Sequence, residues 1–140
     1  MTRTRRATVA MLLVGLAIFS SLYSTQAILP TLVRNMGLSS TEAAMTVSAA
    51  TGALALCVVP ASILSERFGR GRILLISAVA ATGVGLIVPL AQEGWQLIVV
   101  RGLQGALLSG APATAMAWLS EELDDKALPR AMGLYIAGTS

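Results

Sequence analysis

Four apolar stretches, each roughly 20 residues or longer, constrain the fold of this chain more than any other feature of its sequence. They cover residues 7–29, 43–65, 73–92 and 95–120. A helix needs about 20 residues to cross the ~30 Å hydrocarbon core of a bilayer, at a rise of about 1.5 Å per residue. A lone strand would leave its backbone groups unpaired in lipid, so these stretches are predicted to be membrane-spanning helices.

Composition supports the same interpretation. Hydrophobic residues make up 55% of the chain and charged residues 12%, whereas a soluble domain carries about 25% charged residues, so a soluble enzyme is excluded. The net charge of +3 does not indicate a nucleic-acid partner, because the arginines lie in short clusters beside apolar stretches. The single cysteine, Cys57, lies within an apolar stretch, so no disulfide framework, metal site or cofactor is expected.

The first stretch follows Arg3, Arg5 and Arg6, as the apolar region of a secretory signal peptide would. However, it is longer than the usual ~7–15 residue apolar region of such a peptide, and no Ala-x-Ala cleavage site follows it. We therefore expect a retained first helix.

Lysine and arginine residues are distributed unequally between the two sides of the predicted helices. Eight lie in the N-terminal tail, the second connection and the fourth connection, and only Arg34 lies in the first connection. The eight are Arg3, Arg5, Arg6, Arg67, Arg70, Arg72, Lys126 and Arg130. Because basic residues concentrate on the cytoplasmic side, the N-terminus is predicted to be cytoplasmic.

Short connections predict how the helices are arranged. Pro30 is expected to end the first helix, since proline disfavours helical geometry in the preceding residue. Ser39 and Glu42 have the spacing of a capping box and mark the start of the second helix. Glu93 and Gly94 form a very short link between the third and fourth helices. Short links make neighbouring helices antiparallel, so the predicted fold is an all-α, multi-pass transmembrane bundle in contact with the lipid bilayer.

Small residues recur at every fourth position in two of the predicted helices. In lipid, helices associate through small residues that let their backbones approach, so these positions are expected to pack against neighbouring helices. They could equally form a sliding surface for rocking motions. The positions are Ser77, Ala81, Gly85, Gly102, Ala106 and Gly110.

Arg101 is an arginine inside the fourth apolar stretch, where an ionised side chain costs about 2.5–3.5 kcal/mol on insertion scales. It lies six residues after Trp95, so its side chain could reach the outer interface from about 9 Å below. Alternatively, it faces the bundle interior. Gln104 and Gly105 lie at i+3 and i+4 on the same helical face, and this polar stripe favours the inward orientation.

The first helix has polar residues near its outer end, including Tyr23 and Gln26. Tyr23 fits the aromatic belt of a membrane interface, and both residues also fit the lining of a substrate pathway. The helix contains no Asp, Glu or His, although proton coupling needs a titratable group inside the membrane.

Two motifs give the chain a family resemblance. One is the fourth-helix pattern Arg-x-x-Gln-Gly, which is complete at Arg101, Gln104 and Gly105. The other is a loop pattern, Gly-x-Leu-Ala-Asp-Arg-x-Gly-Arg-Arg, between the second and third helices. Its matching residues are Leu64, Arg67, Gly69 and Arg70; Ser62, Glu66 and Gly71 depart from it, and Arg72 supplies a basic residue one place later. In these motifs and in their order, the chain resembles the N-terminal third of a major facilitator superfamily transporter of the drug and sugar efflux branch.

The resemblance implies alternating access, in which two six-helix halves rock around a central site. Glu66, Arg67, Arg70 and Arg72 would form a charge network at the cytoplasmic gate, with Gly69 allowing the turn. Arg101 would take part in substrate or proton handling. Glu66 stands where the pattern has aspartate, and Ser62 where it has glycine. These differences affect the close packing of the gate and leave its charge unchanged.

A fifth apolar segment begins at Ala131 and rises only about 15 Å before the sequence ends. With the resemblance, this predicts an inactive fragment of an exporter in a bacterial inner membrane, whose partner would be the missing portion if the gene is split. One alternative is a complete four-helix carrier that dimerises like the small multidrug resistance proteins, but those carry a glutamate in helix one. Another is a membrane subunit that transports nothing.

Overall fold

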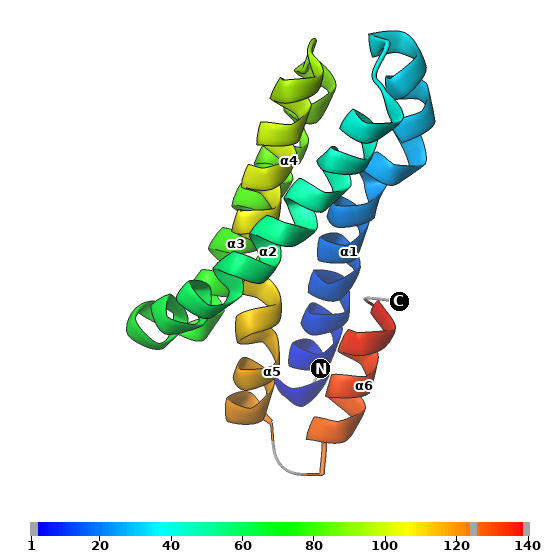
Figure 1. Ribbon diagram of the computed structural model, residues 1–140. Coiled ribbons are helices and arrows are strands. Elements are labelled where there is room, and N and C mark those ends of the chain that lie inside the picture. Colours follow the sequence, from blue (N-terminus) through cyan, green and yellow to red (C-terminus); the bar gives the residue numbers. More distant parts are fainter. Residues whose placement is uncertain (1–2, 124–125, 139–140) are drawn as a thin grey trace.

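The computed structural model describes residues 3–123 and 126–138, which form helices and short connections without any strand in these ranges. The elements are α1 (Arg3–Met36), α2 (Ser40–Phe68), α3 (Arg70–Gly85), the 3-10 helix η1 (Val88–Leu90), α4 (Gly94–Leu108), α5 (Gly110–Glu122) and α6 (Leu128–Gly138). They lie side by side as a bundle (Figure 1). The predicted all-α bundle is therefore confirmed.

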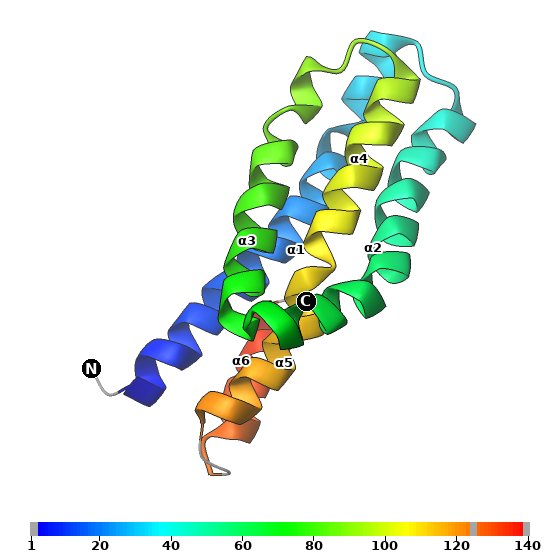
Figure 2. The ribbon, with the colours of Figure 1, turned by 90° about the vertical axis from the view of Figure 1, so that its left-hand side faces the viewer.

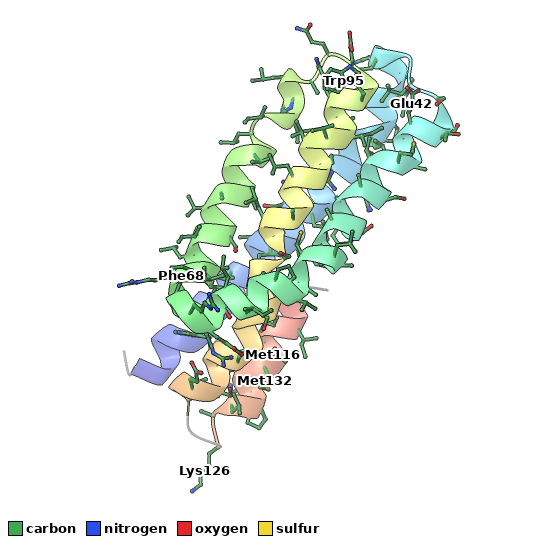
Figure 3. All side chains as sticks on the ribbon, turned by 60° about the vertical axis from the view of Figure 1, so that its left-hand side comes forward. Glu42, Phe68, Trp95, Met116, Lys126 and Met132 are labelled. Carbon is green, nitrogen blue, oxygen red and sulfur yellow. The ribbon has the colours of Figure 1, made fainter. Side chains whose placement is uncertain are left out.

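The connections between helices gather at the two ends of this bundle. The α1–α2 connection and the link from η1 to α4 lie at one end. The α2–α3 turn lies at the other, with the start of α1, the end of α5 and the start of α6 (Figure 1). Along the bundle, α2 packs mainly against α4, α1 against α6, and α3 against α4 and α5 (Figure 2). Glu42 and Trp95 mark the first end and Lys126 marks the second (Figure 3).

The first helix does not end at Pro30, and this prediction was wrong. Pro30 lies inside α1, which continues to Met36 and ends at Gly37 with a φ of 64°. The Leu38 N–H donates to the Val33 carbonyl at 3.1 Å, a bond typical of helices that end in a left-handed glycine. Membrane helices tolerate an internal proline because neighbouring groups satisfy the freed carbonyl, and glycine was the true stop signal.

The predicted third and fourth segments are both interrupted. Helix α3 ends at Gly85 and η1 follows, whereas the stretch 95–120 divides at Ser109 into α4 and α5. The last residues of α3 and α4, Gly85 and Leu108, each lie four residues before a proline, Pro89 or Pro112. Proline cannot donate a hydrogen bond to the carbonyl four residues earlier, and its ring crowds that carbonyl, so the helix is weakened at that turn.

Within the part of the chain that the structure describes, three helical segments are long and apolar enough to cross a membrane: Leu12–Thr31, Ser40–Phe68 and Arg70–Leu90. The α4 and α5 helices, of 15 and 13 residues, are each shorter than a span and follow one another along the bundle (Figure 2). Large apolar side chains cover the outer surface, as expected of a lipid-facing one. The most exposed of them include Leu56, Leu75, Val79, Leu86 and Leu90.

Small residues allow the closest helix contacts. A Cβ atom on Gly105 would lie 1.9 Å from the backbone oxygen of Ala50, and one on Gly110 would lie 2.0 Å from Oγ of Ser77. The backbones of α2 and α4 therefore touch at Gly105. The contact between Ser77 and Gly110 confirms, for these two positions, that small residues pack against neighbouring helices.

Candidate functional site

Arg101 lies inside the bundle and points toward α1. Its side chain is 1% exposed, so the structure places it inward rather than at the outer interface. Nη1 donates to Oε1 of Gln104 at 2.7 Å, and Nη2 donates to the backbone carbonyl of Leu22 at 2.7 Å. A longer contact of 3.5 Å joins Nη1 to the Ser21 carbonyl. The planar guanidinium thus bridges two helices with its terminal nitrogens.

Gln104 connects Arg101 to a third helix. It lies one turn further along α4 and is 2% exposed. Its amide Nε2 donates to the carbonyls of Ser21 on α1 and Ala81 on α3, at 3.4 and 3.5 Å, while its Oε1 accepts from Arg101. The Gln104 amide therefore fixes the guanidinium relative to α1, α3 and α4 at once. We call these two side chains and the three carbonyls the arginine cluster.

Among the described residues, the arginine cluster contains a cation and no anion. All hydrogen-bond acceptors of Arg101 among the described residues are neutral oxygens, and no described carboxylate pairs with it. Its Nε is buried without a hydrogen-bond partner among the described atoms. Neutral carbonyls offset only part of the cost of keeping an ionised group inside a membrane bundle. The cluster therefore presents a positive charge inside the bundle.

The loop motif forms the α2–α3 turn at the other end of the molecule. Gly69 alone links the two helices, with a φ of 93° that side-chain-bearing residues rarely adopt. Nε of Arg70 lies 2.9 Å from Oε1 of Glu121, at the end of α5. Glu66, Arg67 and Arg72 are exposed, and no hydrogen bond or ion pair joins them to other described residues.

Glu121 is the functional candidate that the sequence reasoning missed. Its signal was available, because the acidic run after the fourth stretch is predicted on the same membrane side as the loop motif. The backbone carbonyls of Ser21 and Leu22 were also missed. These carried no signal, because any residue type would supply a carbonyl.

Tyr23 and Gln26 do not join the arginine cluster. Both are exposed on α1, and the Tyr23 ring packs on Phe19 with ring centroids 4.3 Å apart. The structure therefore brings Arg101, Gln104 and Gly105 to the centre of the helix packing. It leaves the predicted substrate-pathway residues on the surface of this part of the protein.

Comparison with known proteins decides the family. Residues 11–140 match the family model described as Major Facilitator Superfamily. The chain belongs to the major facilitator superfamily. It is therefore part of a multi-pass membrane transporter and not an enzyme. The match confirms the family named in the first sequence hypothesis and does not fit a four-helix small multidrug carrier.

Over the aligned residues, several curated relatives are about a third identical to the chain. It is 35% identical over 136 residues to the uncharacterized MFS-type transporter YybF of Bacillus subtilis, covering 97% of this chain and 34% of YybF. It is 33% identical over 135 residues to the inner membrane transport protein YnfM of Escherichia coli, covering 96% and 32%. It is 32% identical over 111 residues to the probable 4-methylmuconolactone transporter of Cupriavidus pinatubonensis, covering 79% and 26%.

The chain thus spans about a third of the length of these two relatives, YybF and YnfM. No solved structure matches it significantly.

Proposed function

We propose that residues 1–140 supply the first four spans and the start of the fifth of a carrier that exports small molecules by alternating access. The observation that carries this proposal is the burial of Arg101, bonded to Gln104 and α1. An ionised residue inside a membrane bundle is costly and by default indicates a substrate or ion pathway. Two halves of such a carrier would rock around a central site, with Arg101 serving that site from the first half.

The gate of this carrier would lie at the α2–α3 turn. Glu66, Arg67 and Arg72 are exposed there, so they are free to meet a second half when the cytoplasmic side closes. The Arg70–Glu121 pair would brace the turn against α5. On α1, the exposed Tyr23 and Gln26 would line the substrate pathway.

The end of the bundle that holds the α2–α3 turn would be cytoplasmic, together with the N-terminus. It bears Arg67, Arg70, Arg72, Lys126 and Arg130, whereas the opposite end bears Arg34, in the last turn of α1. This bias follows the positive-inside rule. A bacterial inner membrane is the proposed location, as the name of YnfM states for that protein.

Thiol labelling tests this orientation. In a Cys57→Ser background, a cysteine replacing the exposed Thr41 should react with an impermeant maleimide on intact cells. A cysteine replacing the exposed Lys126 should react only after the cells are opened. Labelling of the second position and protection of the first on intact cells would reverse the proposed topology.

Export itself is tested in a full-length carrier. This term means residues 1–140 joined to the remaining two thirds of a carrier, taken either from the gene that encodes this chain or from YybF. Energised, efflux-deficient cells would be loaded with ethidium, chloramphenicol or 4-methylmuconolactone. The proposal expects faster loss of at least one compound than from cells with an empty vector. Energy-dependent accumulation instead of loss would contradict export.

The 140-residue form provides the comparison. It should reach the membrane without exporting any compound, because the second half of an alternating-access carrier would be absent. Export by the 140-residue form alone would overturn this part of the proposal and revive the four-helix dimer.

A further inference from the structure

Gly85, the last residue of α3, lies directly against the arginine cluster. A Cβ atom at this position would lie 2.8 Å from Nε2 of Gln104 and 3.8 Å from its Cδ. Non-bonded heavy atoms prefer separations of about 3.5–4.0 Å, so a side chain at this position would displace the amide. The missing Cβ of Gly85 leaves the space that the amide occupies.

The Gln104 amide has little freedom to move aside. Its side chain is 2% exposed, and its Nε2 already spans 3.4 and 3.5 Å to the carbonyls of Ser21 and Ala81. These distances are beyond the usual 2.7–3.2 Å range for such bonds, so a shift away from either carbonyl would break its bond. Because Oε1 and Nε2 belong to one planar amide, a displaced amide would also change the 2.7 Å contact between Oε1 and Nη1 of Arg101.

We propose that Gly85 is a positioning residue for Arg101: its missing Cβ gives the Gln104 amide the place from which it orients the guanidinium. This inference rests on the proposed function only insofar as Arg101 serves transport. Gly85, at the end of α3, thus sets the orientation of the Arg101 guanidinium on α4. Neither the loop motif nor the fourth-helix motif includes this position.

Gly83 provides a matched control on the same helix. A Cβ at Gly83 would meet no atom within 4 Å, and its backbone is helical like that of Gly85. Alanine should therefore be tolerated at position 83, where it reduces only the freedom of the unfolded chain. Any effect particular to Gly85→Ala must then come from its contact with Gln104.

The first measurement observes the guanidinium directly. Arginine side chains of the full-length carrier, labelled with ¹⁵N in detergent, give an Arg101 signal that is assigned by its loss in Arg101→Lys. We expect Gly85→Ala and Gln104→Ala to shift this signal, and Gly83→Ala to leave it in place. An unmoved Arg101 signal in Gly85→Ala would overturn the proposal.

The second measurement is the initial rate of export of the compounds named above, at equal amounts of membrane-inserted protein. Gly85→Ala should lower the rate about tenfold or more, because misplacing a functional group by about 1 Å can cost as much as 100-fold. The double variant Gly85→Ala/Gln104→Ala should match Gln104→Ala alone, since no amide is left to displace. A further loss in the double variant would contradict the proposed route through Gln104.

Two other outcomes are also decisive. If Gly85→Ala does not reach the membrane, adding Gln104→Ala should restore insertion, and failure to do so would overturn the proposal. If Arg101→Ala exports normally, the proposed function fails, whereas the Arg101 signal still decides whether Gly85 positions the guanidinium.

Discussion

The arginine cluster and the α2–α3 turn differ in how many of their arginines find hydrogen-bond or ion-pair partners within this part of the protein. Arg101 is buried, and its hydrogen bonds come from α1 and from its own helix. At the α2–α3 turn, only Arg70 has an ion-pair partner among the described residues, and Arg67 is exposed. Lipid offers no hydrogen bonds, so a buried cation needs its partners locally. Charges in water can remain unpaired at little cost, which leaves them available for the proposed gate.

Glycine serves these regions in two different ways. Gly105 gives space, because its missing Cβ lets α4 lie against the backbone of α2 at Ala50. Gly69 gives conformation, because the turn needs a φ of 93° although nothing lies within 4 Å of its Cβ position. Substitutions at these glycines therefore separate crowding in the buried region from backbone strain in the exposed one.

The largest effect is expected for Gly105→Ala. Its methyl group would overlap a backbone oxygen that cannot rotate away, so α2 and α4 must separate around the arginine cluster. Overpacking typically costs about 1–3 kcal/mol, and a backbone contact belongs at the upper end of that range. Thermal unfolding and the yield of monodisperse carrier in detergent would measure the loss.

Gly102→Ala is the control for this prediction. It lies on the same helix, with a Cβ position 3.9 Å from its nearest neighbours on Ala49. Its unfolding temperature should remain near that of the unsubstituted carrier. Equal stability of the two alanine variants would show that α2 and α4 do not approach closely at Gly105.

A smaller effect is expected for Gly69→Ala. A residue with a side chain costs about 1–3 kcal/mol in this sparsely populated backbone region (φ 93°, ψ 130°), and the open space around Gly69 adds no clash. Gly133→Ala is the control. The Cβ position of Gly133 is equally open and its φ is not positive, so this substitution should not lower stability. Thermal unfolding would compare the two, and indistinguishable values would mean that the turn does not require its glycine.

The smallest effect is expected at the Arg70–Glu121 pair. The side chains are 27% and 57% exposed, and such pairs contribute about 0.2–1 kcal/mol. A double-mutant cycle of Arg70→Ala and Glu121→Ala should give a coupling in that range, which falls as salt is added. Arg67→Ala should show no coupling to Glu121→Ala. A salt-independent coupling of several kcal/mol would contradict this comparison, because it would mean that Arg70 is paired as firmly within this part of the protein as Arg101 is.

The sequence predicted the elements that depend on local patterns. Long apolar stretches predicted the bundle, and the capping box of Ser39 and Glu42 is present, with the Ser39 N–H donating to Oε2 of Glu42 at 2.9 Å. The i, i+3 spacing of Arg101 and Gln104 predicted a shared polar face. These features follow from residues close together in the chain.

Features that depend on distant parts of the chain could not be read in the same way. The sequence predicts a helix end at Pro30, but α1 accommodates this proline, whereas Pro89 and Pro112 follow breaks at the preceding turns. Proline weakens a helix at a known place, but the surrounding packing decides whether the helix breaks there. The partnership of Arg70 with Glu121, 51 positions further on, needed the folded arrangement of α3 and α5.

Export by Arg101→Ala tests most directly whether the buried arginine carries the function. In the full-length carrier, Arg101→Ala should abolish export at an unchanged membrane level, and Arg101→Lys should restore little, since lysine lacks the planar donors that reach Gln104 and Leu22 together. Leu103→Ala, on the exposed face of the same helix, should export normally. Normal export by Arg101→Ala would contradict the account.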